Sequence, residues 1–284
     1  MSEAGEWLAE TLYPDFQQRF KVEQVLYKGR SKFQEVVVFE TRRFGRVLAL
    51  DGVIQTTEAD EFVYHEMLVH LPFLAHGAVR RALIIGGGDG GILEEALKHR
   101  IDKCVMVEID GDVIDVCRKY IPSICGGAFD DHRAEVRVED GIKYIMETKE
   151  KFDVIIVDST DPQGPSEPLF TDEFYSTCAK RLTPRGIMVT QSGVTFMQAE
   201  EAKGTYGRLK RAFPDATFYV AQVPTYAAGF MTLGWGCKSV RPRNTSLAIL
   251  QQRFAALNIK TRYYTPEVHR AAFALPPYIA ALKS

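Results

Sequence analysis

The sequence lacks the features that would set it apart from ordinary globular proteins. No apolar run approaches the length of about 18 to 20 residues that a membrane-spanning helix needs. The 35 Lys and Arg residues against 37 Asp and Glu residues leave a net charge of −2, without the basic excess typical of nucleic-acid-binding proteins. At 46% hydrophobic residues, the chain is also too apolar for a disordered one. We therefore expect a globular protein with neither a nucleic-acid nor a membrane partner.

Two further absences concern targeting and metal binding. The first residues include Glu3, Glu6 and Glu10 and lack the basic start of a secretory signal, so we expect a cytoplasmic protein. The five cysteines form no CxxC pair and their number is odd, which favours neither a zinc site nor a disulfide framework. We interpret them as small buried apolar side chains in a reducing compartment and predict no bound metal.

Short strand-like runs dominate the first part of the chain. We expect strands at residues 22–27, 34–40, 46–50 and 53–57. Turn signals such as Lys28-Gly29 and Asp51-Gly52 separate these runs, which predicts a small antiparallel sheet. A helix is expected over 60–71, ending at Pro72. We place an N-terminal β domain at 1–74 and a catalytic domain at 75–284.

Continuous apolar strands alternate with helical patterns in the second part. The expected strands are 82–85, 104–109, 134–138, 154–157 and 187–190, followed by a closing pair at 218–223 and 230–235. Helices are expected up to about 99 and at 113–120, 142–147 and 172–182. Apolar strands that alternate with helices are typical of a parallel sheet covered on both faces. The sequence therefore predicts an α/β, Rossmann-like domain with a mostly parallel sheet.

A glycine-rich segment follows the first buried strand of this domain and begins a helix. Gly86, Gly88 and Gly91 match the pattern G-x-G-x-x-G, and Glu108 ends the next strand. Such glycines allow a tight turn and a close approach of the backbone to a ligand, while the acid can accept hydrogen bonds from both ribose hydroxyls. The segment therefore predicts a nucleoside-binding site.

Asp89 is unusual within this loop. A dinucleotide or S-adenosylmethionine site brings a phosphate or carboxylate close to such a loop. Two like charges about 4 Å apart repel by on the order of 4 kcal/mol at an effective dielectric constant of about 20. Asp89 would instead attract an ammonium, so we predict a ligand that ends in a cation. A helix-capping role for Asp89 stays open as the alternative.

An acidic segment follows the fourth strand of the predicted sheet. Residues 152–179 contain six acids and no Lys or Arg, and Asp158 lies at the strand end, where ligands bind in α/β sheets. Asp158 and Asp161 lie in a loop rich in Pro and Gly. Close carboxylates in one cleft shift each other's pKa or bind a cation. We therefore predict a loop that binds a cation and supplies a catalytic base.

Together these segments resemble the spermidine synthase family of polyamine aminopropyltransferases, of the bacterial type. The resemblance covers nearly the whole chain and includes residues 47–57, 60–67, 84–91, 107–110, 158–165, 187–191 and 224–226. Ala59 departs from the family pattern, where Arg is more frequent, and Ser166 and Pro168 depart from it in the loop after Asp158.

The resemblance implies a methyltransferase-like Rossmann domain behind a small antiparallel β domain. The implied reaction transfers the aminopropyl group of decarboxylated S-adenosylmethionine to putrescine and gives spermidine and methylthioadenosine. The nucleoside is then a co-substrate and no cofactor is needed. A homodimer or homotetramer, formed through the N-terminal part, is also implied.

The resemblance also implies the roles of individual residues. The site for decarboxylated S-adenosylmethionine would comprise Gln34, His65, Gly86, Gly88, Asp89, Glu108, Asp140, Gly141 and Pro165. Asp158 would be the general base, assisted by Tyr64. The amine would be received by Asp161, Gln191 and Tyr226, with Trp7 as a wall of its channel. Without the resemblance, packing or surface roles stay open for Tyr64, His65, Asp140, Gln191 and Tyr226.

Four alternatives remain at this point. The glycine pattern is also compatible with an S-adenosylmethionine-dependent methyltransferase or with an NAD-dependent oxidoreductase. A polyamine sensor without activity would use the same binding residues. An aminopropyltransferase could also prefer cadaverine, agmatine or spermidine as the acceptor.

Overall fold

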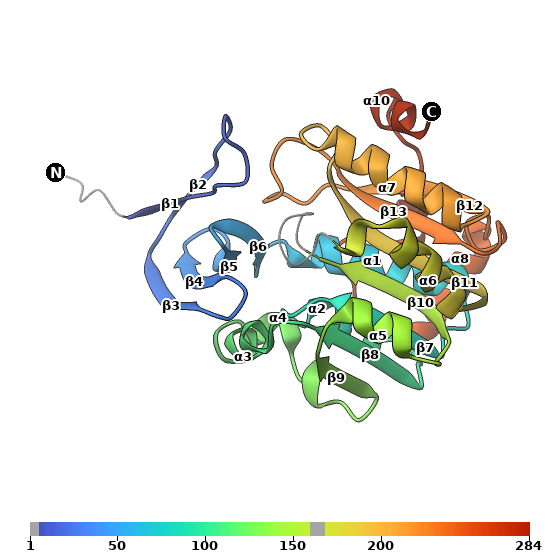
Figure 1. The fold of residues 1–284 in the computed structure, drawn as a ribbon, viewed down its shortest axis with the longest axis horizontal. Coiled ribbons are helices and arrows are strands. Elements are labelled where there is room, and N and C mark those ends of the chain that lie inside the picture. Colours follow the sequence, from blue (N-terminus) through green and yellow to red (C-terminus); the bar gives the residue numbers. More distant parts are fainter. Residues whose placement is uncertain (1–5, 160–167) are drawn as a thin grey trace.

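The N-terminal region consists of two antiparallel sheets, as Figure 1 shows for the computed structural model, which describes residues 6–159 and 168–284. A two-stranded sheet is formed by β1 (Trp7–Ala9) and β2 (Arg19–Lys21). A four-stranded sheet contains, in this order, β3 (Gln24–Arg30), β4 (Glu35–Thr41), β5 (Gly45–Leu50) and β6 (Val53–Thr57). The predicted antiparallel sheet is confirmed, while the short β1–β2 pair lies outside the predicted strands.

The four-stranded sheet buries apolar side chains on both of its faces. Val36, Val38 and Leu48 pack with side chains of helix α3 (Gly111–Tyr120), whereas Val37 and Phe39 belong to a separate cluster on the opposite face. This alternation follows from the period of two in a strand. The predicted turn at Asp51-Gly52 is a two-residue hairpin loop with φ values of 47° and 80°, the left-handed conformations that a type I′ turn requires.

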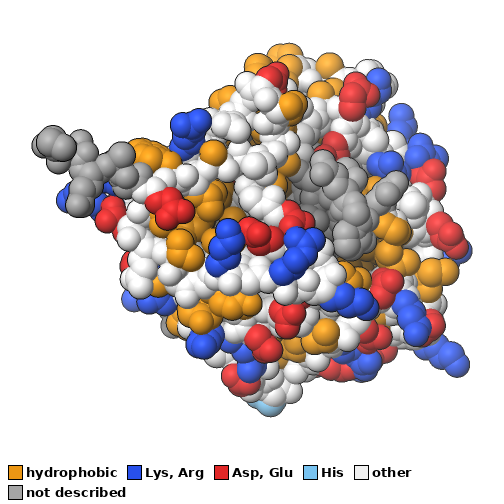
Figure 2. All heavy atoms as spheres, turned by 60° about the vertical axis from the view of Figure 1, so that its left-hand side comes forward, with side chains coloured by type: hydrophobic (Ala, Val, Ile, Leu, Met, Phe, Trp, Pro, Cys, Tyr) orange, Lys and Arg blue, Asp and Glu red, His pale blue; other side chains and the backbone are white. Residues whose placement is uncertain are grey.

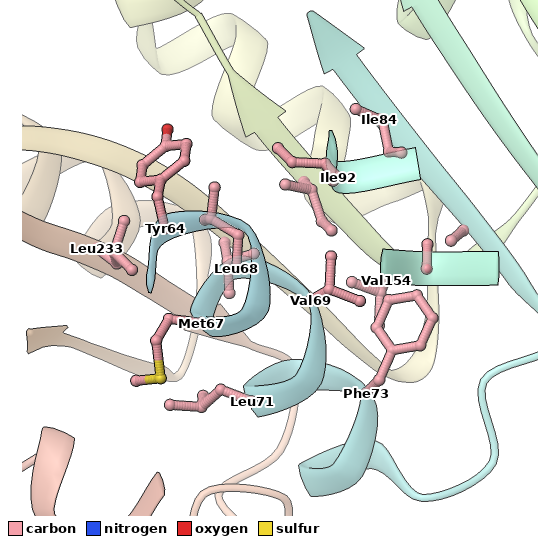
Figure 3. Packing of buried hydrophobic residues seen from close by; sticks show 14 of the residues in the cluster. Tyr64, Met67, Leu68, Val69, Leu71, Phe73, Ile84, Ile92, Val154 and Leu233 are labelled. Atoms are coloured by element: carbon pink, nitrogen blue, oxygen red, sulfur yellow. The ribbon is translucent and has the colours of Figure 1, made fainter. Parts of the chain in front are cut away.

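Helix α1 (Glu61–His76) joins the two regions and contradicts the predicted helix end at Pro72. Proline in a helix interior removes one backbone hydrogen bond and costs about 3 kcal/mol. The helix nevertheless continues, because Phe73, Leu74 and Ala75 beyond the proline are buried in the core. It ends at Gly77, whose φ of 78° is left-handed. Figure 3 shows side chains of α1 packed beside the strands.

A seven-stranded sheet forms the second region, in the order β12-β13-β11-β10-β7-β8-β9. Its strands are β7 (Arg81–Gly86), β8 (Lys103–Glu108), β9 (Ala134–Val138), β10 (Phe152–Asp158), β11 (Leu182–Val194), β12 (Asp215–Ala221) and β13 (Met231–Cys237). The strands from β7 to β11 pair in parallel, and only the β13 pairings are antiparallel. The predicted α/β fold with a mostly parallel sheet is confirmed.

Helices cover both faces of this sheet. They are α2 (Gly91–Leu97), α3 (Gly111–Tyr120), α4 (Pro122–Cys125), α5 (Gly141–Glu147), α6 (Asp172–Arg181), α7 (Ala199–Ala212), α8 (Leu247–Leu257), α9 (Pro266–Ala272) and α10 (Pro277–Ala280). Ile84 of β7 packs in a cluster with α1, α2, α8 and α9, and its neighbour Ile85 packs in a second cluster with α5, α6 and α7. Short 3₁₀ helices are present at Ala128–Asp130 and Ala281–Lys283.

The predictions from composition can be compared with the structure. All five cysteines are buried and unpaired, as predicted. Within 6–159 and 168–284, each helix falls short of the length and apolarity that a membrane crossing requires. Acidic and basic side chains are interspersed on the face in Figure 2, in keeping with the nearly balanced charge. The domain boundary at residue 74 stays a prediction, and it falls within α1.

Candidate active site

A cavity of about 320 Å³ lies where the carboxyl ends of β7, β8 and β10 face α1 and the N-terminal sheets. This volume lies in the range of small-ligand sites, and the position is the one that α/β sheets use for binding. Most of the predicted site residues line the cavity, namely Gln34, Tyr64, His65, Gly86, Gly88, Asp89, Glu108, Asp140, Gly141, Asp158, Gln191 and Tyr226. The structure therefore brings together residues that the sequence separates by up to 192 positions (226 − 34).

Three predicted residues are not placed in the cavity. Trp7 lies on β1 and is 56% exposed, and in this single chain it does not line the cavity. Asp161 and Pro165 lie outside the described residues. The roles of these three residues stay predictions.

The glycine loop brings β7 into close contact with β10. Gly86 pairs with Asp158 in the parallel register, and a Cβ at Gly86 would lie 1.8 Å from the Asp158 carbonyl oxygen. A Cβ at Gly88 would lie 3.2 Å from Glu108 Oε2. Larger residues at these positions would therefore displace groups that line the cavity.

Asp89 contacts the start of α2, and its binding of a cationic ligand stays a prediction. Its Oδ1 accepts a hydrogen bond of 2.9 Å from the Gly91 N–H, at the start of α2. Its Oδ2 lies 3.3 Å from His65 Nε2. Burial alone would raise the pKa of Asp89, but His65 and the Gly91 N–H lower it. Asp89 is therefore an ionised carboxylate with one oxygen on the helix and the other beside a basic side chain.

His65 lies between two carboxylates. Its Nδ1 is 2.7 Å from Glu61 Oε2, one helical turn before it on α1, and its Nε2 faces Asp89. Burial tends to lower the pKa of His65, but the two acids outweigh it and raise this pKa well above its usual value. His65 is therefore a buried side chain at the wall of the cavity whose two carboxylate neighbours favour its protonated form.

Asp158 is the second carboxylate at the centre of the cavity. Burial and the negative charge of Asp89 raise the pKa of Asp158 to about 6, although a hydrogen bond from Tyr64 and the charge of His65 act in the opposite direction. The Tyr64 hydroxyl donates this bond to Asp158 Oδ1 at 2.6 Å. Burial and Asp158 raise the pKa of Tyr64, so that it remains protonated and keeps donating. A carboxylate with a pKa close to neutral pH is suited to general-base catalysis.

Glu108 is a third carboxylate, at the end of β8. Burial raises its pKa to about 7, with further contributions from the charges of Asp110 and Asp158. Its Oε1 accepts a hydrogen bond of 2.9 Å from the Asp110 N–H. Asp110 also caps α3 and accepts a hydrogen bond of 2.9 Å from Gln34 Nε2. This network holds the side chains of Glu108 and Gln34 at one end of the cavity.

The other predicted residues have defined partners. Asp140 Oδ1 accepts from the Ile142 N–H at the start of α5 (2.8 Å). The Gln191 side chain donates to the Ser159 carbonyl oxygen (3.2 Å). The Tyr226 hydroxyl donates to the Gln55 carbonyl oxygen (2.6 Å), and its ring makes an edge contact with that of Tyr64. Each of these side chains is therefore held in one orientation beside the cavity.

Glu10 and Gln18 also line the cavity, and neither belongs to a motif in the sequence. Glu10 Oε1 accepts from the Ile54 N–H (3.0 Å), and its Oε2 accepts from Gln18 Nε2 (2.9 Å). Gln18 Nε2 also donates to the Thr225 carbonyl oxygen (2.6 Å). Thr225 donates its N–H and its hydroxyl to Asp60 Oδ2, at 2.8 and 2.7 Å. These bonds fasten the N-terminal segment to the loop after β12, which no local sequence signal reveals.

The lining of the cavity is strongly acidic. Its carboxylates are Glu10, Asp51, Asp89, Glu108, Asp140 and Asp158, and neither Lys nor Arg occurs among the described residues that line it. Within the described ranges, no group of three or more His, Cys, Asp or Glu side chains could hold a metal ion. Such a lining favours a cationic nucleoside over the pyrophosphate of a dinucleotide.

Two family models match adjacent parts of the chain. Residues 61–246 match the spermine/spermidine synthase domain. The chain belongs to the spermine/spermidine synthase family. Residues 6–58 match a second model, described as the spermidine synthase tetramerisation domain.

Two polyamine aminopropyltransferases are similar to this chain over most of their length. The chain is 52% identical over 271 residues to polyamine aminopropyltransferase 1 of Pseudomonas aeruginosa, covering 95% of both chains. It is 52% identical over 277 residues to the polyamine aminopropyltransferase of Ruegeria sp., covering 97% of this chain and 98% of the relative. The chain is thus an enzyme, a polyamine aminopropyltransferase.

Solved structures of spermidine synthases share the fold. A spermidine synthase in complex with the transition-state analogue AdoDATO matches with a TM-score of 0.94 and 37% identity. The spermidine synthase of Thermotoga maritima matches with a TM-score of 0.93 and 37% identity. Both matches cover 100% of this chain and 96% of the other.

Proposed function

We propose that this polyamine aminopropyltransferase transfers the aminopropyl group of decarboxylated S-adenosylmethionine to putrescine and releases spermidine and methylthioadenosine. The observation that carries the proposal is the pair of buried carboxylates, Asp89 and Asp158, in one acidic cavity. Decarboxylated S-adenosylmethionine, here called the aminopropyl donor, ends in an ammonium that Asp89 can bind. The carboxylate of S-adenosylmethionine itself would be repelled there.

The remaining contacts of the aminopropyl donor follow from the position of each residue. Glu108, at the end of β8, would accept hydrogen bonds from the ribose hydroxyls. Asp140 and Gly141, after β9, would contact the adenine. Gln34 would also contact the aminopropyl donor. The sulfonium is already an activated leaving group, so we propose that neither a metal nor another cofactor takes part.

In the proposed chemical step, the amine nitrogen of putrescine attacks the aminopropyl carbon next to the sulfonium. The new C–N bond forms as the C–S bond breaks. The electron pair of the C–S bond stays on the sulfur and neutralises its positive charge. A free alkylamine has a pKa of about 10.4, so the attacking nitrogen must lose a proton. Asp158 would accept that proton, and Gln191 and Tyr226 would orient the amine. Asp161 would bind the acceptor with them.

A panel of acceptors tests the proposed reaction. We expect the highest kcat/KM with putrescine when cadaverine, agmatine and spermidine are compared in the presence of the aminopropyl donor, with spermidine and methylthioadenosine as products. Product analysis by mass spectrometry identifies the group transferred. Methyl transfer from S-adenosylmethionine would contradict the proposal, and a higher kcat/KM with another amine would change the assigned acceptor.

Tyr64→Phe is expected to lower kcat by roughly tenfold, because it removes a hydrogen bond to a charged group. The same bond lowers the pKa of Asp158, so its loss should move the acid limb of the pH–rate profile to higher pH. The measurement is kcat against pH at saturating substrates. Tyr144→Phe on α5, outside the cavity lining, is the matched control. An acid limb that stays in place would contradict the assigned role.

We further propose that the enzyme is a homotetramer assembled through its N-terminal region, with a homodimer as the alternative. The match of residues 6–58 to the tetramerisation model supports this. In such an assembly, exposed Trp7 would lie close to a neighbouring subunit.

A further inference from the structure

The geometry around His65 favours a hydrogen on each of its ring nitrogens. Nδ1 lies 2.7 Å from Glu61 Oε2, and Nε2 lies 3.3 Å from Asp89 Oδ2. An ionised carboxylate can only accept hydrogen bonds, so a ring nitrogen facing one must donate. The ring is only 2% exposed, so water cannot replace either partner. The free enzyme therefore holds His65 as an imidazolium, with its charge balanced by two acids.

Among the residues that the structure describes, the titratable groups placed around this imidazolium are acidic or neutral. Glu61 faces it from α1, Asp89 from the loop before α2, and Asp158 from the end of β10. The Tyr64 ring lies 5.7 Å away, centroid to centroid. The backbone of α2 closes the remaining side, because a Cβ at Gly91 would lie 2.2 Å from the ring. The cation is thus stabilised by carboxylates that line the proposed ammonium site or lie next to it.

We propose that His65 is the internal counter-ion of Asp89 and that it releases its proton to solvent when the ammonium of the aminopropyl donor binds. The inference rests on the proposed function, since it places that ammonium beside Asp89. Two cations about 4 Å apart repel by on the order of 4 kcal/mol at an effective dielectric constant of about 20. Loss of one proton from the imidazolium removes this repulsion, and the ammonium keeps its own charge.

Glu61 then determines which proton leaves. Its carboxylate continues to accept from Nδ1–H, so the proton lost is the one on Nε2. Nε2 becomes a hydrogen-bond acceptor that faces the incoming ammonium beside Asp89. Glu61, which lies outside the cavity lining, is thus a positioning residue that converts His65 from a competing cation into an acceptor.

Calorimetry measures this exchange directly. The aminopropyl donor and methylthioadenosine are each titrated into the enzyme at pH 7.5, in two buffers with different ionisation enthalpies. We expect nearly one proton released per aminopropyl donor bound and almost none with methylthioadenosine, which lacks the ammonium but contacts Glu108 in the same way. The affinity for the aminopropyl donor should also rise about tenfold per pH unit below the pKa of His65.

Variants distinguish proton release by His65 from a merely structural role of this side chain. His65→Gln should bind the aminopropyl donor without releasing a proton. Glu61→Gln should shift the pH dependence of this affinity to lower pH, because it removes one of the charges that raise the pKa of His65. Glu94→Gln on α2, where Glu94 pairs with Lys98, is the control, because it also removes one negative charge. It should change neither the proton release nor the pH dependence of the affinity.

The inference would be overturned if the aminopropyl donor bound to the unmodified enzyme without proton release, or if both ligands caused equal release. Release that persists in His65→Gln would also overturn it. In each case the aminopropyl donor still binds, so the proposed function survives. Failure of the unmodified enzyme to bind it would instead contradict the proposed function.

Discussion

Replacement of Asp158 by asparagine is expected to lower kcat by about 10² or more and to leave the aminopropyl donor bound. General-base catalysis contributes about 10² to 10⁴ in rate, and an amide cannot accept the proton of the attacking amine. Asn has nearly the same shape, and its oxygen can still accept the 2.6 Å hydrogen bond from Tyr64. The loss should therefore appear in the chemical step rather than in binding.

Single-turnover kinetics at saturating substrates and calorimetry with the aminopropyl donor measure the two effects separately. In the unmodified enzyme the rate should fall as the pH decreases through about 6, because protonation of Asp158, with its pKa raised to about 6, removes the base. The variant should lack this acid limb. Asp172→Asn, at an exposed position on α6, makes the same chemical change as a control. Near-normal turnover in Asp158→Asn would defeat the assignment.

The parallel sheet could be predicted from the sequence because its signals are local. The first four predicted strands of this sheet are each followed by a helical pattern, so the order of elements already implies the architecture. Helix α7, after the fifth strand, was not predicted. The end of α1 could not be predicted in the same way. Pro72 is a local stop signal, but the burial of Phe73 and Leu74 against distant strands overrides it. Local rules fail where long-range packing supplies more free energy.

The same distinction applies to the active site. Gly86 and Asp158 lie at strand ends and Asp89 lies in the loop after the first of them, so their position in the cavity follows from the topology once the strands are recognised. Gln18 could not be found in this way, because its partner Thr225 lies 207 residues along the chain. The spacing of Glu61 and His65 fits one helical turn, but their shared task depends on Asp89 from another element.

The geometry of Asp89 allows both of the roles that the sequence left open. Helix capping uses Oδ1 and leaves Oδ2 directed at His65. A carboxylate has enough acceptor sites for both. The cap fixes the orientation of the carboxyl group, and this orientation presents the second oxygen to the cation. The structural role of Asp89 thus prepares the side chain for the proposed ligand.

Asp89→Ala is expected to weaken binding of the aminopropyl donor by about 10² and binding of methylthioadenosine by only about threefold. Removal of one partner from a buried charge pair costs about 3 to 5 kcal/mol, and a tenfold change in affinity corresponds to about 1.4 kcal/mol. The ammonium of the aminopropyl donor must first displace the charge of His65, which places the net effect at the lower end of that range. Methylthioadenosine lacks the ammonium, so its affinity should change little.

Calorimetry gives the dissociation constants of both ligands. The loss of affinity for the aminopropyl donor, relative to that for methylthioadenosine, tests whether Asp89 binds the ammonium. Asp89→Asn separates charge from structure, because its side-chain oxygen can still accept from the Gly91 N–H while the negative charge is lost. Asp89→Asn should weaken binding of the aminopropyl donor about as much as Asp89→Ala does. Equal weakening of both ligands would show that Asp89 only supports the loop. With the charge gone, His65 also loses the partner that holds its second proton, so binding to Asp89→Asn should release much less than one proton.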